Sequence, residues 1–97
     1  MAAPKPHKWT LVAERQFLEK LEWIARQNPP AAIRLYDRVF QSIARLETYP
    51  EIGTPDHKRR RRYPIPQTTF VMFYRVKSRA VIIARFLRQE QDDHLTR

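Results

Sequence analysis

Apolar residues in the N-terminal half of the chain recur at helical spacing. They form one stripe between Glu14 and about Gln27, and a second between Pro30 and about Thr48, with charged residues filling the opposite faces. Steps of three and four residues place side chains on one face of an α-helix, so each stripe predicts an amphipathic helix. The stripes comprise Phe17, Leu21 and Ile24 in the first segment, and Ile33, Tyr36, Phe40, Ile43 and Leu46 in the second.

The two predicted helices are separated only by Asn28-Pro29-Pro30. Proline lacks the N–H that a helix interior needs and disfavours helical backbone in the preceding residue, yet it suits the first turn of a new helix. Two amphipathic helices joined by so short a break fold back on each other as an αα-hairpin.

The C-terminal half changes to strand-like patterns. Thr69–Val76 and Ala80–Leu87 are rich in β-formers and are separated only by Lys77-Ser78-Arg79, which predicts a β-hairpin. Alternation predicts that Phe70, Met72, Tyr74 and Val76 share one face, and that Val81, Ile83, Arg85 and Leu87 share another. Because both faces are largely apolar, one covers the helices and the other is more apolar than a solvated face should be.

Shorter signals complete the expected order. Lys8–Val12 alternates and predicts a first strand, residues 49–56 are a proline-containing loop, and Tyr63–Ile65 predicts a short strand. The order β-αα-βββ predicts an α+β fold of two layers, a helix hairpin packed on a mostly antiparallel sheet. We expect a single domain over residues 1–97, with a loose tail at 1–6 and a flexible C-terminus at 89–97.

Composition excludes several classes of protein. The 97 residues suffice for one hydrophobic core, and the absence of cysteine excludes disulfides and thiolate metal sites. The three histidines are too dispersed for a metal triad, so we expect neither a metal nor a cofactor. No apolar run approaches the roughly 20 residues that span a bilayer, and the start lacks the apolar region of a secretory signal. A cytoplasmic protein without membrane association is expected.

The net charge of +9 indicates an anionic partner. Residues 1–50 carry eight Lys and Arg against five Asp and Glu, whereas residues 51–97 carry eleven against five. For the basic run we favour an anion-binding edge over a solvated loop, because consecutive cations repel each other without a counter-charge. The candidate anion-binding residues are Lys58, Arg59, Arg60, Arg61 and Arg62 of the run, and Arg75, Arg85 and Arg88 beyond it. For Arg75 and Arg85, pairing with Glu47 or Glu51 is the open alternative.

Several short motifs occur in a recognisable order. They are Pro30-Ala31-Ala32, Leu46 with Pro50 and Gly53, a basic residue at Arg61 or Arg62, Phe73-Tyr74-Arg75-Val76, and Val81-Ile82-Ile83 with Arg85. In this order, over residues 8 to about 93, the chain resembles the RelE/ParE superfamily of type II toxins. The resemblance implies a toxin held inactive by a cognate antitoxin, whose acidic, amphipathic C-terminal segment wraps it in a hetero-oligomer. We expect Trp23, Phe73, Arg85 and Phe86 to contact that antitoxin.

The superfamily contains RelE-like enzymes that cut mRNA on the ribosome. They place two lysines along the second strand, an arginine within the third, and an arginine and a tyrosine after the last; others use a Glu with a C-terminal His-Tyr pair. Here those positions hold Pro64, Pro66, Val71, Gln89 and Leu95, and no tyrosine follows His94. Because RNA cleavage needs groups that move protons and cations that hold phosphate charge, the resemblance argues against an enzyme.

The resemblance is closer to the ParE-like branch, which is associated with inhibition of DNA gyrase. The strand Phe73–Val76, Arg85 and the Gln91-Asp92-Asp93 ending favour it, whereas Arg88 stands near where such chains often carry histidine. The first alternative is a RelE-like, ribosome-dependent mRNA endonuclease that uses Arg61, Arg62, Arg85 and Arg88 to stabilise phosphate. The second is a small nucleic-acid-binding regulator, ranked last because no aromatic stacking platform is evident.

Overall fold

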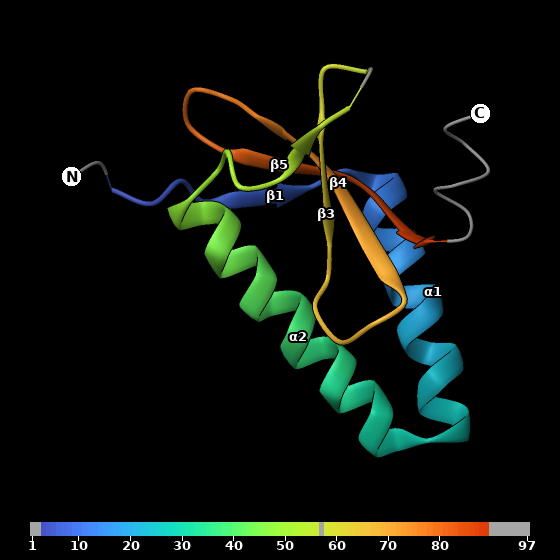
Figure 1. The fold of residues 1–97 in the computed structure, drawn as a ribbon. Coiled ribbons are helices and arrows are strands. Elements are labelled where there is room, and N and C mark those ends of the chain that lie inside the picture. Colours follow the sequence, from blue (N-terminus) through green and yellow to red (C-terminus); the bar gives the residue numbers. More distant parts are fainter. Residues whose placement is uncertain (1–2, 57, 90–97) are drawn as a thin grey trace.

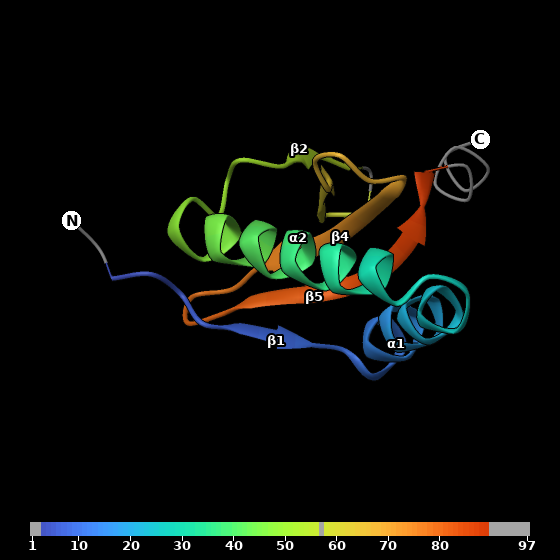
Figure 2. The ribbon, with the colours of Figure 1, turned by 90° about the horizontal axis from the view of Figure 1, so that it is seen from below.

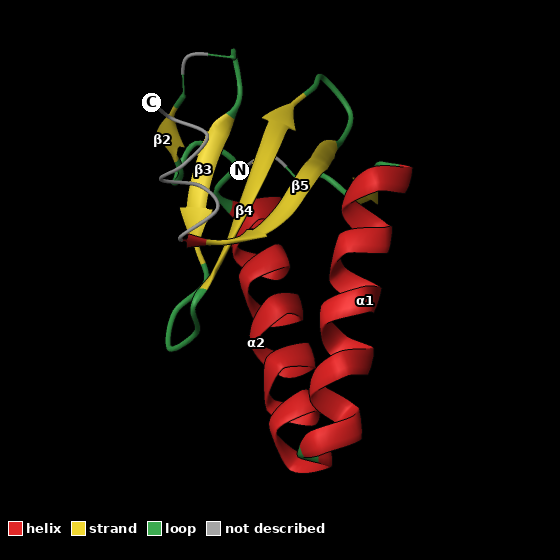
Figure 3. Cartoon of the chain, turned by 90° about the vertical axis from the view of Figure 1, so that its right-hand side faces the viewer, coloured by secondary structure: helices red, strands yellow, loops and turns green. Residues whose placement is uncertain are grey.

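The structure is a computed structural model and describes residues 3–56 and 58–89 (Figure 1). Figure 2 shows both helices on one side of the strands, and Figure 3 shows the helices lying side by side. The elements are β1 (His7–Trp9), α1 (Leu11–Gln27), α2 (Pro29–Thr48), β2 (Thr54–Pro55), β3 (Arg61–Pro64), β4 (Phe70–Val76) and β5 (Val81–Arg88). The predicted α+β fold of two layers is confirmed.

The sheet has the strand order β1-β5-β4-β3-β2. β1 pairs with β5 in parallel, whereas the other three pairings are antiparallel. The sheet contains one strand more than predicted, the two-residue β2, which lies in the stretch expected to be loop. Its register sets Thr54 opposite Arg62 and Pro55 opposite Arg61. The polar and proline-containing sequence of residues 49–56 hides this edge, because so short a strand leaves no alternating pattern.

The side chains of Thr10 and Asn28 cap the N-termini of the two helices. The Thr10 hydroxyl accepts a hydrogen bond from the Ala13 N–H, at 3.1 Å, and caps α1. Asn28 ends α1 by donating its backbone N–H to the Ile24 carbonyl, and begins α2 by accepting from the Ala31 N–H with its side chain. One residue therefore serves both helices, which is why the connection is so short.

The first predicted boundary is wrong because of the Thr10 cap. The strand ends at Trp9 rather than at Val12, and the helix begins at Leu11 rather than at Glu14. Leu11 and Val12 continue the alternating pattern, but they are 62% and 46% exposed on the first turn of α1. The expected strand Tyr63–Ile65 is also displaced, because pairing with β4 begins at Arg61 within the basic run.

The main core lies between the helices and the sheet. Its aromatic centre is Phe17, whose ring stacks on Trp9 with centroids 5.2 Å apart and meets the edge of Phe86 at 5.2 Å. The buried members are Ala13, Phe17, Leu35, Val39, Ile43, Leu46, Ile65, Phe70, Met72, Tyr74, Val81, Ile83 and Phe86. The predicted face of β4 is thus confirmed.

A β-bulge breaks the predicted alternation in β5. Phe73 pairs with Arg85 but Tyr74 pairs with Ile83, so Ala84 has no partner of its own in β4. Val81 and Ile83 face the helices, whereas beyond the bulge Phe86 takes that face and Leu87 joins a second buried cluster. The prediction that Val81, Ile83, Arg85 and Leu87 share one face is therefore wrong.

Part of the expected loose tail is attached to the fold. The Lys5 N–H donates to the Glu47 carbonyl at 3.0 Å, and the Pro6 carbonyl accepts from the Val81 N–H at 2.9 Å. Within the expected flexible C-terminus, the Gln89 N–H donates to the Thr69 carbonyl. The remainder, residues 90–97, lies outside the described part of the chain.

The Tyr74 hydroxyl connects the sheet to the loop that follows α2. It donates to the Pro50 carbonyl at 2.7 Å and accepts from the Gly53 N–H at 2.8 Å. A Cβ at Gly53 would lie 2.6 Å from that hydroxyl oxygen, so the contact itself requires glycine. Burial is the main cause of the raised pKa of Tyr74.

Removing this hydroxyl tests its contribution. Tyr74→Phe leaves the Pro50 carbonyl and the Gly53 N–H without their partner, so we expect the free energy of unfolding to fall by about 2 kcal/mol. Denaturant unfolding measures it, with Tyr49→Phe, at an exposed ring, as the control. Equal stability of the two variants would contradict the structural role.

The same hydroxyl makes stability depend on alkaline pH. Because the folded-state pKa lies above the ordinary value of 10.0, the contribution is fully present below pH 10.0 and is lost as pH rises through the folded pKa. The wild-type melting temperature should therefore fall more steeply than that of Tyr74→Phe above this pH. Parallel melting curves would show that the shift has no energetic consequence.

Candidate partner-binding surface

The sheet face turned away from the helices carries most of the arginines predicted to bind anions. We call it the outer face; Phe73 lies on it, and the pairing of Phe73 with Arg62 and Arg85 brings both arginines to the same side. Arg75 lies two residues along β4 from Phe73 and faces the same way. Arginines from three neighbouring strands, distant in sequence, thus converge on one surface.

The floor of this surface is apolar and already covered. Val71, Phe73 and Leu87 form a cluster that is between 0% and 6% exposed. The guanidinium carbon of Arg60 lies 4.0 Å from the centre of the Phe73 ring, which is a cation–π contact. The sequence predicts a second sheet face that is more apolar than a solvated face should be, and Arg60 covers part of it.

Arg60 is held by an acidic partner, Asp56, that was not among the predicted site residues. Its Nε donates to the Asp56 carboxylate at 2.6 Å, and the side chains are 8% and 10% exposed. Removing one partner of a buried charge pair strongly destabilises the folded protein. The i,i+4 spacing of Asp56 and Arg60 was the available signal, although no helix is present there. Arg60 is therefore a structural member of the basic run.

Arg61 points to the other side of the sheet. It pairs in register with the core residue Tyr74, and its Nη1 donates to the carbonyls of Glu51 and Gly53 at 3.1 and 2.7 Å. These bonds anchor the same loop that Tyr74 holds. Because successive side chains alternate between the two faces of the sheet, Arg60 and Arg62 lie on the outer face and Arg61 lies on the opposite face.

The beginning of the run is exposed. Lys58 and Arg59 both lie on the surface, and Arg59 has a φ of 58°, in the left-handed region. A non-glycine residue in this conformation occurs mostly in tight turns, which fits its place between β2 and β3. The expectation of one continuous anion-binding edge is corrected to three separate environments.

Arg75 and Arg85 are half-buried on the outer face. The alternative that they pair with Glu47 or Glu51 is wrong for the described residues, since the Glu47 carboxylate lies 3.0 Å from His7 Nδ1 and the Glu51 contact with Arg61 uses a backbone carbonyl. Within residues 3–56 and 58–89, Arg85 Nη1 donates only to the carbonyl of the bulged residue Ala84, at 2.8 Å. Both guanidiniums keep donors for a partner.

Trp23 and Arg88 come together elsewhere. With Glu19, Lys20, Ile24 and Phe70 they line a hollow of about 280 Å³ where α1 meets the end of β5. Trp23 is 52% exposed, and the Arg88 guanidinium carbon lies 6.0 Å from the centre of the Phe70 ring. Trp23 is therefore accessible, and its expected contact with an antitoxin stays a prediction.

Phe73 and Phe86 are placed differently from the expectation that they contact an antitoxin. Both are 0% exposed: Phe73 lies under Arg60, and Phe86 stacks on Phe70 in the main core with centroids 5.0 Å apart. Neither ring offers surface to a partner, so both are corrected to structural roles. Apolar character within a strand does not reveal which side of the sheet is covered.

The described residues include no group of three or more His, Cys, Asp or Glu that is placed to hold a metal ion. Within the same residues, no helix combines the length and apolar character needed to cross a membrane. The position of His94 lies outside the described part of the chain.

The buried pair gives a stability test within the basic run. Arg60→Ala removes the cover of Phe73 and leaves the Asp56 carboxylate buried without it, so we expect a loss of about 3 kcal/mol in the free energy of unfolding. Lys58→Ala, at an exposed position, should change it by less than about 0.5 kcal/mol. Similar small losses for both variants, measured by denaturant unfolding, would assign Arg60 to the solvated part of the run.

Comparisons with known proteins agree with this architecture. A family model for the ParE toxin of the parDE type II toxin–antitoxin system matches residues 8–93. A solved structure described as the chromosomal ParDE toxin–antitoxin system from P. aeruginosa matches the fold with a TM-score of 0.75 at 19% identity, over 90% of this chain and 98% of that one. No curated protein sequence matches the chain. Since the family model spans nearly the whole sequence, the chain belongs to the ParE toxin family of type II toxin–antitoxin systems.

Proposed function

We propose that this toxin inhibits DNA gyrase through protein contacts made by the outer face, and that a cognate antitoxin neutralises it. The observation that carries the proposal is the convergence of Arg62, Arg75 and Arg85 on one sheet face with a rigid apolar floor. Arginine is enriched at protein interfaces because its stem packs on apolar surface while its guanidinium binds carboxylates. Such a surface fits an acidic protein partner in the cytoplasm.

The chemistry of the outer face favours contact over catalysis. A guanidinium stays protonated at any pH that a protein survives, so arginine cannot act as the general base that RNA cleavage requires. Pro64 and Val71, which stand where cleaving relatives carry cations, pair directly with each other across β3 and β4. At that point the described outer face offers only hydrocarbon. The ribosome-dependent endonuclease is therefore the less supported alternative.

The helix hairpin offers the antitoxin an apolar surface. Leu18, Ile33 and Tyr36 are 52%, 64% and 48% exposed, and the Tyr36 ring lies against Phe17 and Phe40 of the core. Exposed large apolar side chains that continue a core are typical of partner-binding surfaces. An acidic, amphipathic segment would place its apolar side here, folding as it binds.

The outer-face arginines should be needed for toxicity. Arg75→Gln with Arg85→Gln removes two guanidiniums that form no ion pair among the described residues, so growth inhibition on induction in bacteria should fall at least tenfold while the melting temperature changes little. Lys77→Gln with Arg79→Gln, in the exposed β4–β5 turn, removes equal charge and is the control. DNA-damage signalling and gyrase-cleaved DNA are measured in the same cultures. Cut mRNA with intact DNA would overturn the gyrase proposal.

The hairpin surface should be needed for neutralisation. Ile33→Glu introduces a charge where we place the antitoxin's apolar side, so its affinity should fall at least tenfold, with toxicity retained. Titration calorimetry with the short protein encoded beside the toxin measures the change. Arg15→Glu, an exposed position of α1, is the matched control. Equal affinities for both variants would exclude this surface.

A further inference from the structure

A second basic surface runs along α2, apart from the outer face. Arg34, Arg38 and Arg45 recur at intervals of four and seven residues, so they fall within about 40° of the helix circumference and span about 16 Å of its axis. α2 lies on the opposite side of the sheet from the outer face (Figure 2). In the sequence, apolar residues of the helical stripe separate the members of this row and hide it.

The row has no counter-charge of its own. None of the three arginines forms an ion pair with any residue in the ranges 3–56 and 58–89. α2 contains two carboxylates. Glu47 is turned toward His7, and its carboxylate lies 3.0 Å from the imidazole Nδ1. Asp37 is offset from the row by at least about 60° around the helix axis. Three uncompensated guanidiniums on one rigid helix attract anions.

Polar groups flank the first half of the row. Arg34 and Arg38 line a hollow of about 380 Å³ with Gln67, Thr68 and Thr69 of the β3–β4 turn. The Thr68 hydroxyl already donates to the Ile65 carbonyl at 2.8 Å, whereas Gln67 and Thr69 are exposed. Hydroxyl and amide groups beside arginine are the groups that contact phosphate oxygens in nucleic-acid complexes.

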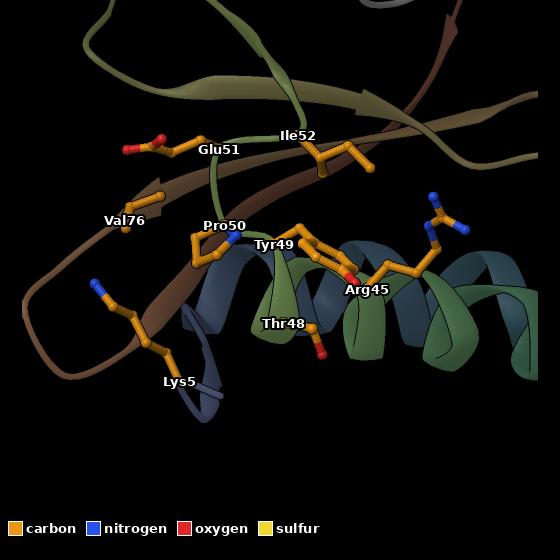
Figure 4. Close-up of a pocket in the computed structure, with 8 residues that line it drawn as sticks. All are labelled: Lys5, Arg45, Thr48, Tyr49, Pro50, Glu51, Ile52 and Val76. Atoms are coloured by element: carbon orange, nitrogen blue, oxygen red, sulfur yellow. The ribbon is translucent and has the colours of Figure 1, made fainter. Parts of the chain in front are cut away.

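An aromatic ring stands at the other end. Arg45 and Tyr49 line a pocket of about 640 Å³, and Tyr49 is 63% exposed (Figure 4). Figure 4 also shows the Glu51 carboxylate, the one acidic group among the labelled residues, turned toward the Val76 side and away from Arg45. An exposed ring next to a guanidinium is a stacking platform for a nucleic-acid base.

We propose that the row on α2, with Tyr49, binds single-stranded nucleic acid. Arg34, Arg38 and Arg45 hold successive backbone phosphates, and an unpaired base stacks on the Tyr49 ring. Arginine occupies every position of the row, and its planar fork matches phosphate geometry. An acidic peptide would pair with the arginines but would not stack on the exposed Tyr49 ring. Single-stranded nucleic acid would make both contacts. A duplex would leave the ring unused, because its bases are already stacked.

Fluorescence anisotropy with labelled oligodeoxythymidylate and oligouridylate of about twelve nucleotides tests this proposal on the full chain. Each phosphate contact contributes about 0.7 to the slope of log affinity against log salt, so replacing the three arginines with glutamine should reduce the slope by about 2. Affinity should fall at least tenfold. If the triple variant melts early, Arg34→Gln with Arg45→Gln, both exposed, replaces it.

Two further variants separate stacking from charge. Tyr49→Leu should weaken binding about tenfold with an unchanged salt slope, because it removes the ring and no cation. Lys8→Gln, Arg15→Gln and Arg79→Gln together remove three exposed cations elsewhere and should cost less than threefold. Preference for the DNA or the RNA oligonucleotide supports the proposal and shows which of the two backbones the row binds more tightly.

Three results would overturn the proposal. Equal losses in the two triple variants would assign binding to net charge, and equal affinity for a duplex of the same length would exclude recognition of an unpaired base. Displacement of the oligonucleotide by an equally charged glutamate peptide, at the same concentration as by unlabelled oligonucleotide, would assign the row to an acidic protein segment. The assay uses neither gyrase nor antitoxin, so its outcome is independent of the proposed toxin function.

Discussion

The central strand β4 carries large apolar side chains on both faces, while the chain supplies helices for only one of them. Met72 and Tyr74 are buried beneath α1 and α2, and Val71 and Phe73 are equally buried on the opposite face. The second face is covered in part by Arg60, whose buried partner Asp56 holds it over Phe73. The chain thus uses a charged side chain where other two-layer folds would leave polar residues facing water.

This constraint explains the character of the outer face. An arginine stem is mostly hydrocarbon, so it covers apolar surface while its guanidinium reaches solvent. Arg62, Arg75 and Arg85 come from three neighbouring strands, β3, β4 and β5, and lie on the face of the buried floor. The result is a basic surface on an apolar floor, in which Asp56 pairs with Arg60.

The loop after α2 is fixed as firmly as the sheet. Tyr74 and Arg61 bind its carbonyls and the Gly53 N–H from β4 and β3, so the segment that carries Tyr49 is held by the core. A base-stacking ring on a rigid support loses little conformational entropy on binding. The toxin thus presents two basic surfaces on opposite sides of the sheet.

Local periodicity determined much of this protein before its structure was known. The hairpin break at Asn28-Pro29-Pro30, the helix-facing side of β4 and the ParE-like motifs were all readable, because they depend on neighbouring residues. Only the tertiary structure decided that Ala84 is bulged, that Phe86 is core, and that the basic run divides among three environments. These depend on pairing between distant strands, where one unpaired residue reverses every side chain that follows it.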